Sequence, residues 1–199
     1  MFEDFVMPKN NETEFIEIAS KLGIRKLYFL YNFEDYGAGI SQKKIQSFEN
    51  KKIRIETGSI ANSKNLNQAH KQSNLIVVKS SEKDRIMIEN RKINLLYGFE
   101  ELNRKDYLHQ RASGLNHVMC EVARKNNIAI GFSYSSLFHK DNGALAIGRM
   151  KQNIKLCQKY KIKTAIGAFT SNPFELRLPY DVCGLFRILG MNISKNKSF

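Results

Sequence analysis

The chain has 199 residues, of which 42% are hydrophobic and 26% are charged, as is typical of an ordinary globular domain. No apolar run is long enough to cross a membrane, and the opening MFEDFVM lacks the basic segment and apolar run of a signal peptide. We therefore expect one domain over residues 1–191, a flexible tail over residues 192–199, and a cytoplasmic location. The three cysteines, Cys120, Cys157 and Cys183, are odd in number and far apart, which predicts reduced thiols.

The charge of the chain is strongly positive and unevenly distributed. Lys and Arg total 32 against 19 acidic residues, which gives a net charge of +13. Residues 142–199 contain ten basic and two acidic residues, so this last part carries +8 of the +13. Such a one-sided field favours a polyanionic partner such as nucleic acid, and a merely solvated surface is the alternative.

Short β-rich runs alternate with helical patterns along the whole chain. In chain order the sequence predicts a helix at 12–22, strands at 26–31 and 53–57, a helix at 66–72, a strand at 75–78, a helix at 82–90, a strand at 94–97, a helix from Ser113 to about Lys125, a strand at 129–133, a helix at 142–160, a strand at 164–168, and a helix from Pro179 to near Leu189. Repeated β-α units indicate parallel strands, and six or more of them in 199 residues favour a compact, TIM-like β/α barrel. An open doubly wound sheet is the alternative.

In both architectures functional side chains gather at the carboxyl ends of the strands. Basic residues follow four of the predicted strands, and aromatic residues are interleaved with them. Basic groups attract phosphates, and aromatic rings stack on unpaired bases. The basic residues are Lys79, Arg104, Lys105, His109, Arg111, His139, Lys140 and Arg177, and the aromatic ones are Tyr97, Phe99, Tyr107, Tyr134 and Phe169.

Arg111 lies just before Ser113, a candidate helix N-cap. A cation at the positive end of a helix is unfavourable unless an anion lies nearby, so this position fits a phosphate site. Pairing of Arg111 with Asp106 or Glu101 explains it equally well. On the long helix, Lys151, Lys155 and Lys159 repeat every four residues and repel one another, which an anionic partner would relieve. We include Arg149 of the same helix among the expected RNA-binding residues.

Catalytic motifs are absent from the sequence. It contains no H-x-H, H-E-x-x-H, G-x-S-x-G, Walker A or G-x-G-x-x-G pattern, and no carboxylate pair is arranged locally for acid–base chemistry. His117 and Glu121 share a helix face, but two ligands are too few for a metal site. We therefore expect no catalytic residue and no metal site in this chain.

Residues 104–137, RKDYLHQRASGLNHVMCEVARKNNIAIGFSYSSL, resemble the ribonuclease P protein component 3 family. Residues 174–191, FELRLPYDVCGLFRILGM, resemble the same family through their L-R-x-P-x-D pattern, as do residues 76–97 and the opening MFEDF. The similarity covers most of the chain, and the short form looks archaeal rather than eukaryotic. Two departures concern Leu178, where the family often has a small polar residue, and the loop at 169–174.

This resemblance implies a β/α barrel akin to the polymerase-and-histidinol-phosphatase hydrolases. It implies a protein subunit of ribonuclease P, the ribonucleoprotein that removes 5′ leaders from precursor tRNA. The catalyst would be the RNA subunit with its Mg²⁺, so no cofactor is expected in this chain. The implied partners are ribonuclease P RNA, precursor tRNA, a ferredoxin-like protein subunit and other holoenzyme proteins.

The favoured hypothesis is thus a non-catalytic RNA-binding subunit. A metal-dependent phosphoesterase on the same barrel is the alternative, and a purely protein-binding scaffold would leave the positive charge unexplained. The expected RNA-binding residues are Lys79, Arg104, Lys105, His109, Arg111, Arg149, Lys151, Lys155, Lys159 and Arg177.

Overall fold

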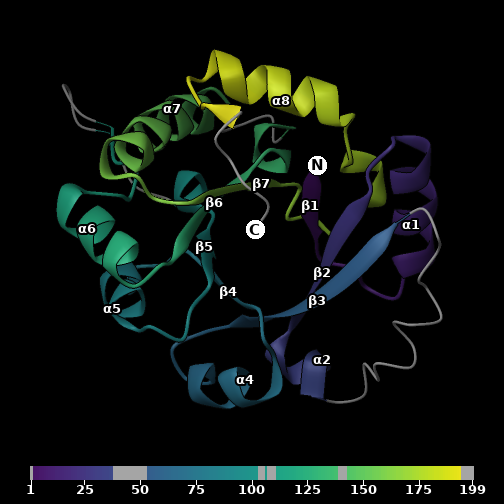
Figure 1. Cartoon of the computed structure of the whole chain (residues 1–199), viewed down its shortest axis with the longest axis horizontal. Coiled ribbons are helices and arrows are strands. Elements are labelled where there is room, and N and C mark those ends of the chain that lie inside the picture. The colour runs from purple at the N-terminus through teal and green to yellow at the C-terminus, as the bar shows by residue number, and fades with distance from the viewer. Residues whose placement is uncertain (1, 38–52, 103–105, 107–110, 139–142, 194–199) are drawn as a thin grey trace.

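Within the part of the chain that the structure describes, seven parallel strands form a single sheet in which each strand pairs with the next (Figure 1). The computed structural model describes residues 2–37, 53–102, 106, 111–138 and 143–193. The strands are β1 (Glu3–Val6), β2 (Lys26–Asn32), β3 (Arg54–Ala61), β4 (Ile76–Lys79), β5 (Leu95–Tyr97), β6 (Ala129–Ser133) and β7 (Thr164–Gly167). All six strand pairs are parallel, as the alternating β-α pattern predicts.

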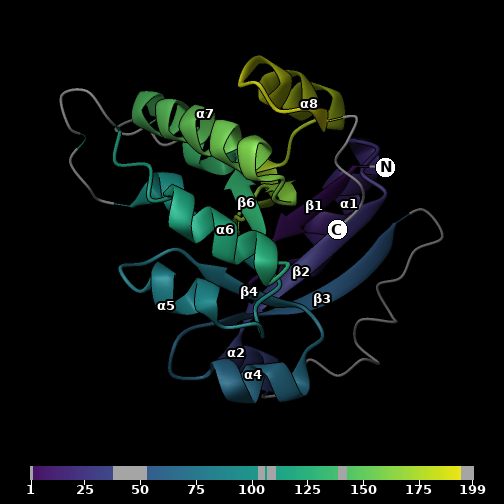
Figure 2. The same cartoon turned by 60° about the vertical axis from the view of Figure 1, so that its left-hand side comes forward.

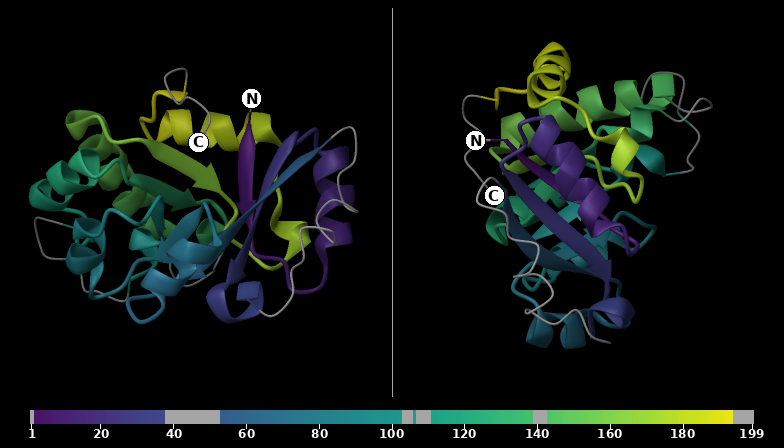
Figure 3. Two further views of the ribbon diagram at one scale, coloured as in Figure 1. Left: turned by 60° about the horizontal axis from the view of Figure 1, so that its bottom comes forward. Right: turned by 90° about the vertical axis from the view of Figure 1, so that its right-hand side faces the viewer.

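The sheet curls until its first and last strands meet, which makes a barrel. Phe169 N, just after β7, donates to the carbonyl of Phe5 in β1 at 2.7 Å, and Met7 N donates to the carbonyl of Thr170 at 2.8 Å. Figure 1 shows the strands arranged around a common centre with the helices outside them, and Figure 3 shows the same strands from two other sides. The predicted β/α barrel is therefore confirmed, and the open doubly wound sheet is wrong.

Helices connect the strands and cover the outer face of the barrel (Figure 2). They are α1 (Glu12–Lys21), α2 (Phe33–Gly37), α4 (Leu66–Gln72), α5 (Asp84–Glu89), α6 (His117–Lys125), α7 (Gly143–Tyr160) and α8 (Pro179–Ile188), with 3₁₀ turns η1 (Phe99–Glu101), η2 (Ser135–Phe138) and η3 (Pro173–Glu175). The predicted strands and helices are confirmed with shifts at their ends. None of the helices in the described residues is long and apolar enough to span a membrane.

One predicted helix start is wrong. Helix α6 begins at His117 and not at Ser113, because the side chain of Asn116 accepts a hydrogen bond from Met119 N at 2.9 Å and caps the first turn. Ser113 is buried, and its hydroxyl and carbonyl accept hydrogen bonds from Gln152 and Asn153 of α7. Ser113 therefore anchors the segment before α6 to α7.

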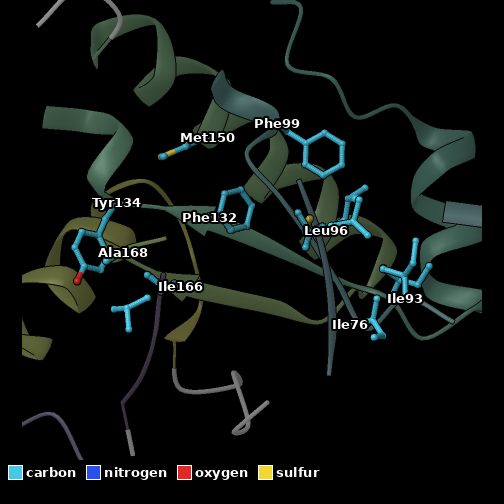
Figure 4. Close-up of a cluster of buried hydrophobic side chains, with 14 of the residues drawn as sticks. Ile76, Ile93, Leu96, Phe99, Phe132, Tyr134, Met150, Ile166 and Ala168 are labelled. Atoms are coloured by element: carbon cyan, nitrogen blue, oxygen red, sulfur yellow. The ribbon is translucent and has the colours of Figure 1, made fainter. Parts of the chain in front are cut away.

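The outer layer of the core lies between the strands and the helices. Along β6, Ile130 and Phe132 belong to this layer, whereas Ala129 faces the barrel interior. Figure 4 shows Phe132 with Leu96 and Phe99 in one cluster, with Met150 of α7 nearby. This alternation is expected of strands that have helices on one side and the barrel interior on the other.

Aromatic rings fill the interior of the barrel. Phe5 stacks on Tyr28 at 4.5 Å between ring centroids and on Phe169 at 5.4 Å, and Phe169 stacks on Tyr97 at 4.3 Å. The rings fit because the neighbouring strands carry glycine. A Cβ at Gly131 would lie 2.9 Å from Tyr97 Cβ and 3.1 Å from Phe169 Cζ. The interior at this height is thus packed with side chains, as in other small β/α barrels.

Candidate nucleic-acid interface

The segment that joins β5 to α6 carries several of the expected RNA-binding residues. Arg104, Lys105 and His109 lie outside the described residues, as do Tyr107, His139 and Lys140. Asp106 and Arg111 are described, and both contact α7. Helix α7 thus contacts this segment at Asp106 and at Arg111.

Arg149 is the anchor of that support. Its side chain is 1% exposed, and its Nε and Nη2 atoms donate to Asp106 Oδ1 at 3.2 Å and 3.1 Å. Its Nη1 atom donates to the carbonyls of Leu102 at 2.6 Å and Glu100 at 3.3 Å. These contacts use the guanidinium of Arg149 within the protein, and the side chain is buried. The structure therefore does not support the direct RNA contact by Arg149 that we expected from the sequence.

Asp106 joins two arginines of different exposure. Burial alone would raise the pKa of Asp106, but hydrogen bonds from Ala112 N and Arg149, together with the charges of Arg149 and Arg111, hold it below its usual value. The Nη1 atom of Arg111 lies 3.3 Å from Asp106 Oδ2, and the Arg111 side chain is 49% exposed. The pairing of Arg111 with Asp106 is confirmed, and Arg111 is not placed at the end of α6.

Gly148 gives Arg111 its position on α7. A Cβ at Gly148 would lie 2.4 Å from Arg111 Cζ, so the guanidinium lies directly on the helix backbone. Together with Asp106, this contact fixes the guanidinium while leaving half of the side chain open to solvent. A fixed and accessible guanidinium is suited to binding phosphate.

Further cations lie along the outer face of α7. Lys151, Lys155 and Lys159 are exposed, and none of them forms an ion pair within the described residues. Lys159 Nζ lies 5.5 Å from the ring centroid of Tyr160. The three lysines therefore form a row along α7 in which neighbouring lysines are about one helical turn apart. The row begins two residues after Arg149 in the sequence.

Lys79 and Arg177 occupy other parts of the carboxyl-end rim. Lys79 Nζ pairs with Glu101 Oε2 at 2.7 Å, so part of its charge is compensated. Arg177 lies 4.3 Å from the ring centroid of Phe138 and donates to the carbonyls of Phe174 and Leu176 at 2.9 Å. Arg177 is exposed and held in one orientation, which a phosphate or a stacked base can use.

Two buried carboxylates, Asp4 and Glu100, lie near the rim. Asp4 accepts hydrogen bonds from Tyr134 Oη and Ala168 N, both at 2.7 Å, and burial raises its pKa to about 7. Glu100 accepts one from Ser133 N at 2.9 Å, and burial raises its pKa to about 7 as well. No group of three or more His, Cys, Asp or Glu that could hold a metal occurs among the described residues.

Sequence reasoning missed an apolar surface on α8 and the turn before it. Phe174, Tyr180 and Ile188 are 74%, 82% and 81% exposed, and Leu178 is 47% exposed. Tyr180 and Ile188 flank Gly184 at helical spacing, and a Cβ at Gly184 would meet nothing within 4 Å. The sequence did carry a signal for this surface: Tyr180, Gly184 and Ile188 form a second apolar stripe on the side of α8 opposite the buried Val182 and Phe186. Exposed apolar groups of this size mark contact surfaces.

Comparison with known proteins decides the family. A sequence model of the family described as RNase P subunit p30 matches residues 2–199. The chain belongs to the RNase P subunit p30 family. Among its relatives, Ribonuclease P protein component 3 of Methanocaldococcus jannaschii is 23% identical over 75% of this chain and 63% of its own length. The protein of the same name from Methanosarcina acetivorans is 28% identical over 59% of this chain and 47% of its own length. The chain thus spans about half the length of these relatives.

Solved structures agree on the fold of this p30-family chain. A chain in the cryo-EM structure of archaeal Ribonuclease P with mature tRNA has a TM-score of 0.77, at 20% identity over 96% of this chain and 84% of that one. Histidinol phosphate phosphatase from Lactococcus lactis, solved with zinc, L-histidinol and phosphate, has a TM-score of 0.69 at 8% identity over 94% of this chain and 92% of its own. The barrel resemblance to these hydrolases is therefore confirmed.

Proposed function

We propose that this chain is an RNA-binding subunit of ribonuclease P that assists the RNA-catalysed removal of 5′ leaders from precursor tRNA. The observation that carries the proposal is the family match over residues 2–199, and the row of exposed lysines on α7 supports it. Lys151, Lys155 and Lys159 would contact phosphates together with Arg111, which is fixed beside them on Gly148. Arg177 and Lys79 would add cations on the rim. The cytoplasm is the expected place of this work.

The chain would contribute binding rather than chemistry. Hydrolysis of a phosphodiester needs a group that activates water, usually a metal ion or a general base. The stacked rings of Phe5, Tyr97 and Phe169 fill the barrel interior, and Asp4 is committed to hydrogen bonds with Tyr134 and Ala168. The catalyst would then be the RNA subunit with its Mg²⁺. Among the described residues, no group that could hold a metal supports the alternative of a metal-dependent phosphoesterase.

A second protein subunit would contact the apolar face of α8. Tyr180, Gly184 and Ile188 leave a shallow apolar surface on which another helix can pack closely. The family resemblance implies a ferredoxin-like partner, whose helices could supply such a face. In this arrangement the lysines of α7 face RNA and the apolar side of α8 faces protein. Figure 2 shows these two helices side by side.

The decisive experiment is a salt titration of RNA binding. Each lost phosphate contact lowers the slope of log K against log salt by about 0.7–0.9. Replacement of Lys151, Lys155 and Lys159 by Gln should therefore reduce the slope by about 2–3 units. The matched control replaces Lys21, Lys71 and Lys125, which are also exposed, and should change the slope far less. Equal slopes for the two triple variants would assign the α7 lysines to the solvated surface.

Reconstitution tests the role itself. The purified chain should not cleave precursor tRNA with or without Mg²⁺, and addition of the cognate RNA and partner proteins should restore cleavage. Cleavage by the chain in the absence of RNA would overturn the proposal.

A further inference from the structure

A cavity of about 480 Å³ opens where β2, β3 and β4 end. Its lining residues come mainly from the ends of these three strands, from α2 and from the segment that leads into α4. Its volume is within the range of small-molecule sites, and the carboxyl ends of barrel strands are where such sites occur. Of the proposed RNA-binding residues that the structure describes, only Lys79 lines it, so RNA binding by those residues does not account for the cavity.

The walls of the cavity combine apolar and polar groups. The apolar part of the wall is formed by Ile60, Val78 and Met87, and Phe33 of α2 adds a half-buried aromatic ring. Asn62, Asn65, Ser63 and Ser81 contribute amide and hydroxyl groups. An apolar wall with an aromatic ring and a polar edge suits a flat ligand that has hydrogen-bonding edges.

Two amide groups at the cavity have donors to spare. Asn62 Oδ1 accepts from Lys64 N at 2.8 Å, and Asn65 Oδ1 accepts from Asn62 N at 2.7 Å. These bonds fix which end of each carboxamide is the oxygen. Neither NH₂ group has a partner among the described residues, although both residues line the cavity. A ligand with carbonyl or ring-nitrogen acceptors would satisfy these donors.

Charges of opposite sign lie on opposite sides of the cavity. Glu34 and Asp35 follow β2, whereas Lys79 is the last residue of β4 and Lys83 follows that strand. Since β3 lies between those strands, the two sides are about 10 Å apart at the strand ends. Lys79 is paired with Glu101, and Lys83 is exposed with no ion pair among the described residues. The ligand that fits therefore has donors at one end and negative charge at the other.

We propose that this cavity binds one nucleotide, with the amino-bearing edge of its base toward Glu34 and Asp35 and its phosphate toward Lys83. Guanine matches best, because its N1–H and N2–H groups form two parallel donors that a carboxylate can accept. Phe33 supplies a ring for stacking, and the amides of Asn62 and Asn65 supply donors to the base or sugar. The inference rests on the proposed RNA-binding function, in which the nucleotide is an unpaired residue of RNA.

Titration of the full chain with guanosine 5′-monophosphate, followed by NMR of the backbone amides, tests the site. We expect shifts centred on residues 60–65 and 81–87. Glu34→Gln and Lys83→Gln should each weaken binding about tenfold, since each removes a charge-assisted hydrogen bond. Ser63→Trp, at an exposed position, should fill the cavity and abolish binding. The controls Glu17→Gln and Lys71→Gln change the same charges on exposed positions outside the cavity and should bind normally.

A second arm identifies the source of the nucleotide. Ultraviolet cross-linking in the reconstituted ribonucleoprotein should join RNA to a peptide within residues 60–65 or 81–87, and Ser63→Trp should remove that cross-link. Monophosphate binding without a cross-link would assign the cavity to a free nucleotide and overturn its assignment to RNA. Absence of monophosphate binding, or equal binding by Ser63→Trp, would overturn the nucleotide site. If the unsubstituted chain also failed to support cleavage in reconstitution, the proposed function would fall as well.

Discussion

Arg149→Met would test whether the buried arginine is a structural anchor. Methionine keeps an unbranched side chain but removes all the donors that reach Asp106 and the carbonyls of Leu102 and Glu100. Those acceptors then lose the hydrogen bonds that Arg149 donates. The Asp106 side chain is mostly buried, since it is 20% exposed. Removal of one member of a buried ion pair costs about 3–5 kcal/mol.

The expected loss lies at the lower end of that range. Asp106 keeps its hydrogen bonds with Ala112 N and Arg111, so its charge is still partly compensated. We therefore expect a decrease of about 3 kcal/mol in the free energy of unfolding. For a chain of this length that corresponds to a fall in Tm of roughly 6–12 °C.

Thermal and urea unfolding of Arg149→Met would be compared with Arg124→Met, which makes the same change on an exposed position of α6 and should alter stability by about 0.5 kcal/mol or less. RNA affinity per folded molecule should decrease only as far as Arg111 loses its support. Unchanged stability combined with a large loss of RNA affinity would refute the anchor and make Arg149 a direct RNA ligand.

Three further substitutions probe other parts of the chain. Arg111→Ala should weaken RNA binding while changing the free energy of unfolding by about 1 kcal/mol or less, because the ion pair of Arg111 with Asp106 is half-exposed. Arg111→Lys should restore RNA binding only partly. Normal RNA binding by Arg111→Ala in a filter assay would contradict a phosphate contact at this residue. Gly131→Ala should lower the free energy of unfolding by about 1–3 kcal/mol, because the added methyl group collides with Tyr97. Gly184→Ala should raise it by about 1 kcal/mol, because the added methyl group has no atom within 4 Å. If urea unfolding shows Gly131→Ala to be as stable as Gly184→Ala, the packed interior is contradicted. Burial raises the pKa of Asp4 to about 7, so the folded state holds a proton that the unfolded state releases, and stability should fall as pH rises from about 4 to 7. Asp4→Asn should reduce the Tm difference between pH 5 and pH 8, and an unchanged difference would show that Asp4 does not titrate in this window.

Most of the barrel was predictable from local patterns, because its strands are short apolar runs between amphipathic helices. Strand β1 was not predictable, since Glu3 and Asp4 make it look like an acidic loop. Asp4 can be buried because Tyr134 and Ala168, which are far away in the sequence, donate hydrogen bonds to its carboxylate. The false N-cap at Ser113 has a similar origin, because Asn116 competes for that role and α7 binds Ser113.

The candidate interface was predictable in part. Lys151, Lys155 and Lys159 lie together on the solvent side of α7, as their four-residue spacing implies. Arg149 belongs to the same helix but lies on the buried side, and composition alone does not separate a buried cation from an exposed one. The cavity at the ends of β2, β3 and β4 was not predictable from the sequence, since its residues come from three separate segments of the chain and share no local motif.

Closure of the barrel has a consequence for how the chain is made. Asp4 and Ala168, which share a hydrogen bond, are 164 positions apart, so β1 has no partner on one side until β7 has left the ribosome. At usual elongation rates that delay is on the order of ten seconds. Throughout it the ionised Asp4 carboxylate lies on an open strand edge, where a charge opposes pairing with another nascent chain. When β7 arrives, the same carboxylate accepts the amide of Ala168 and becomes buried, so a group that is costly inside the finished barrel protects the unfinished one.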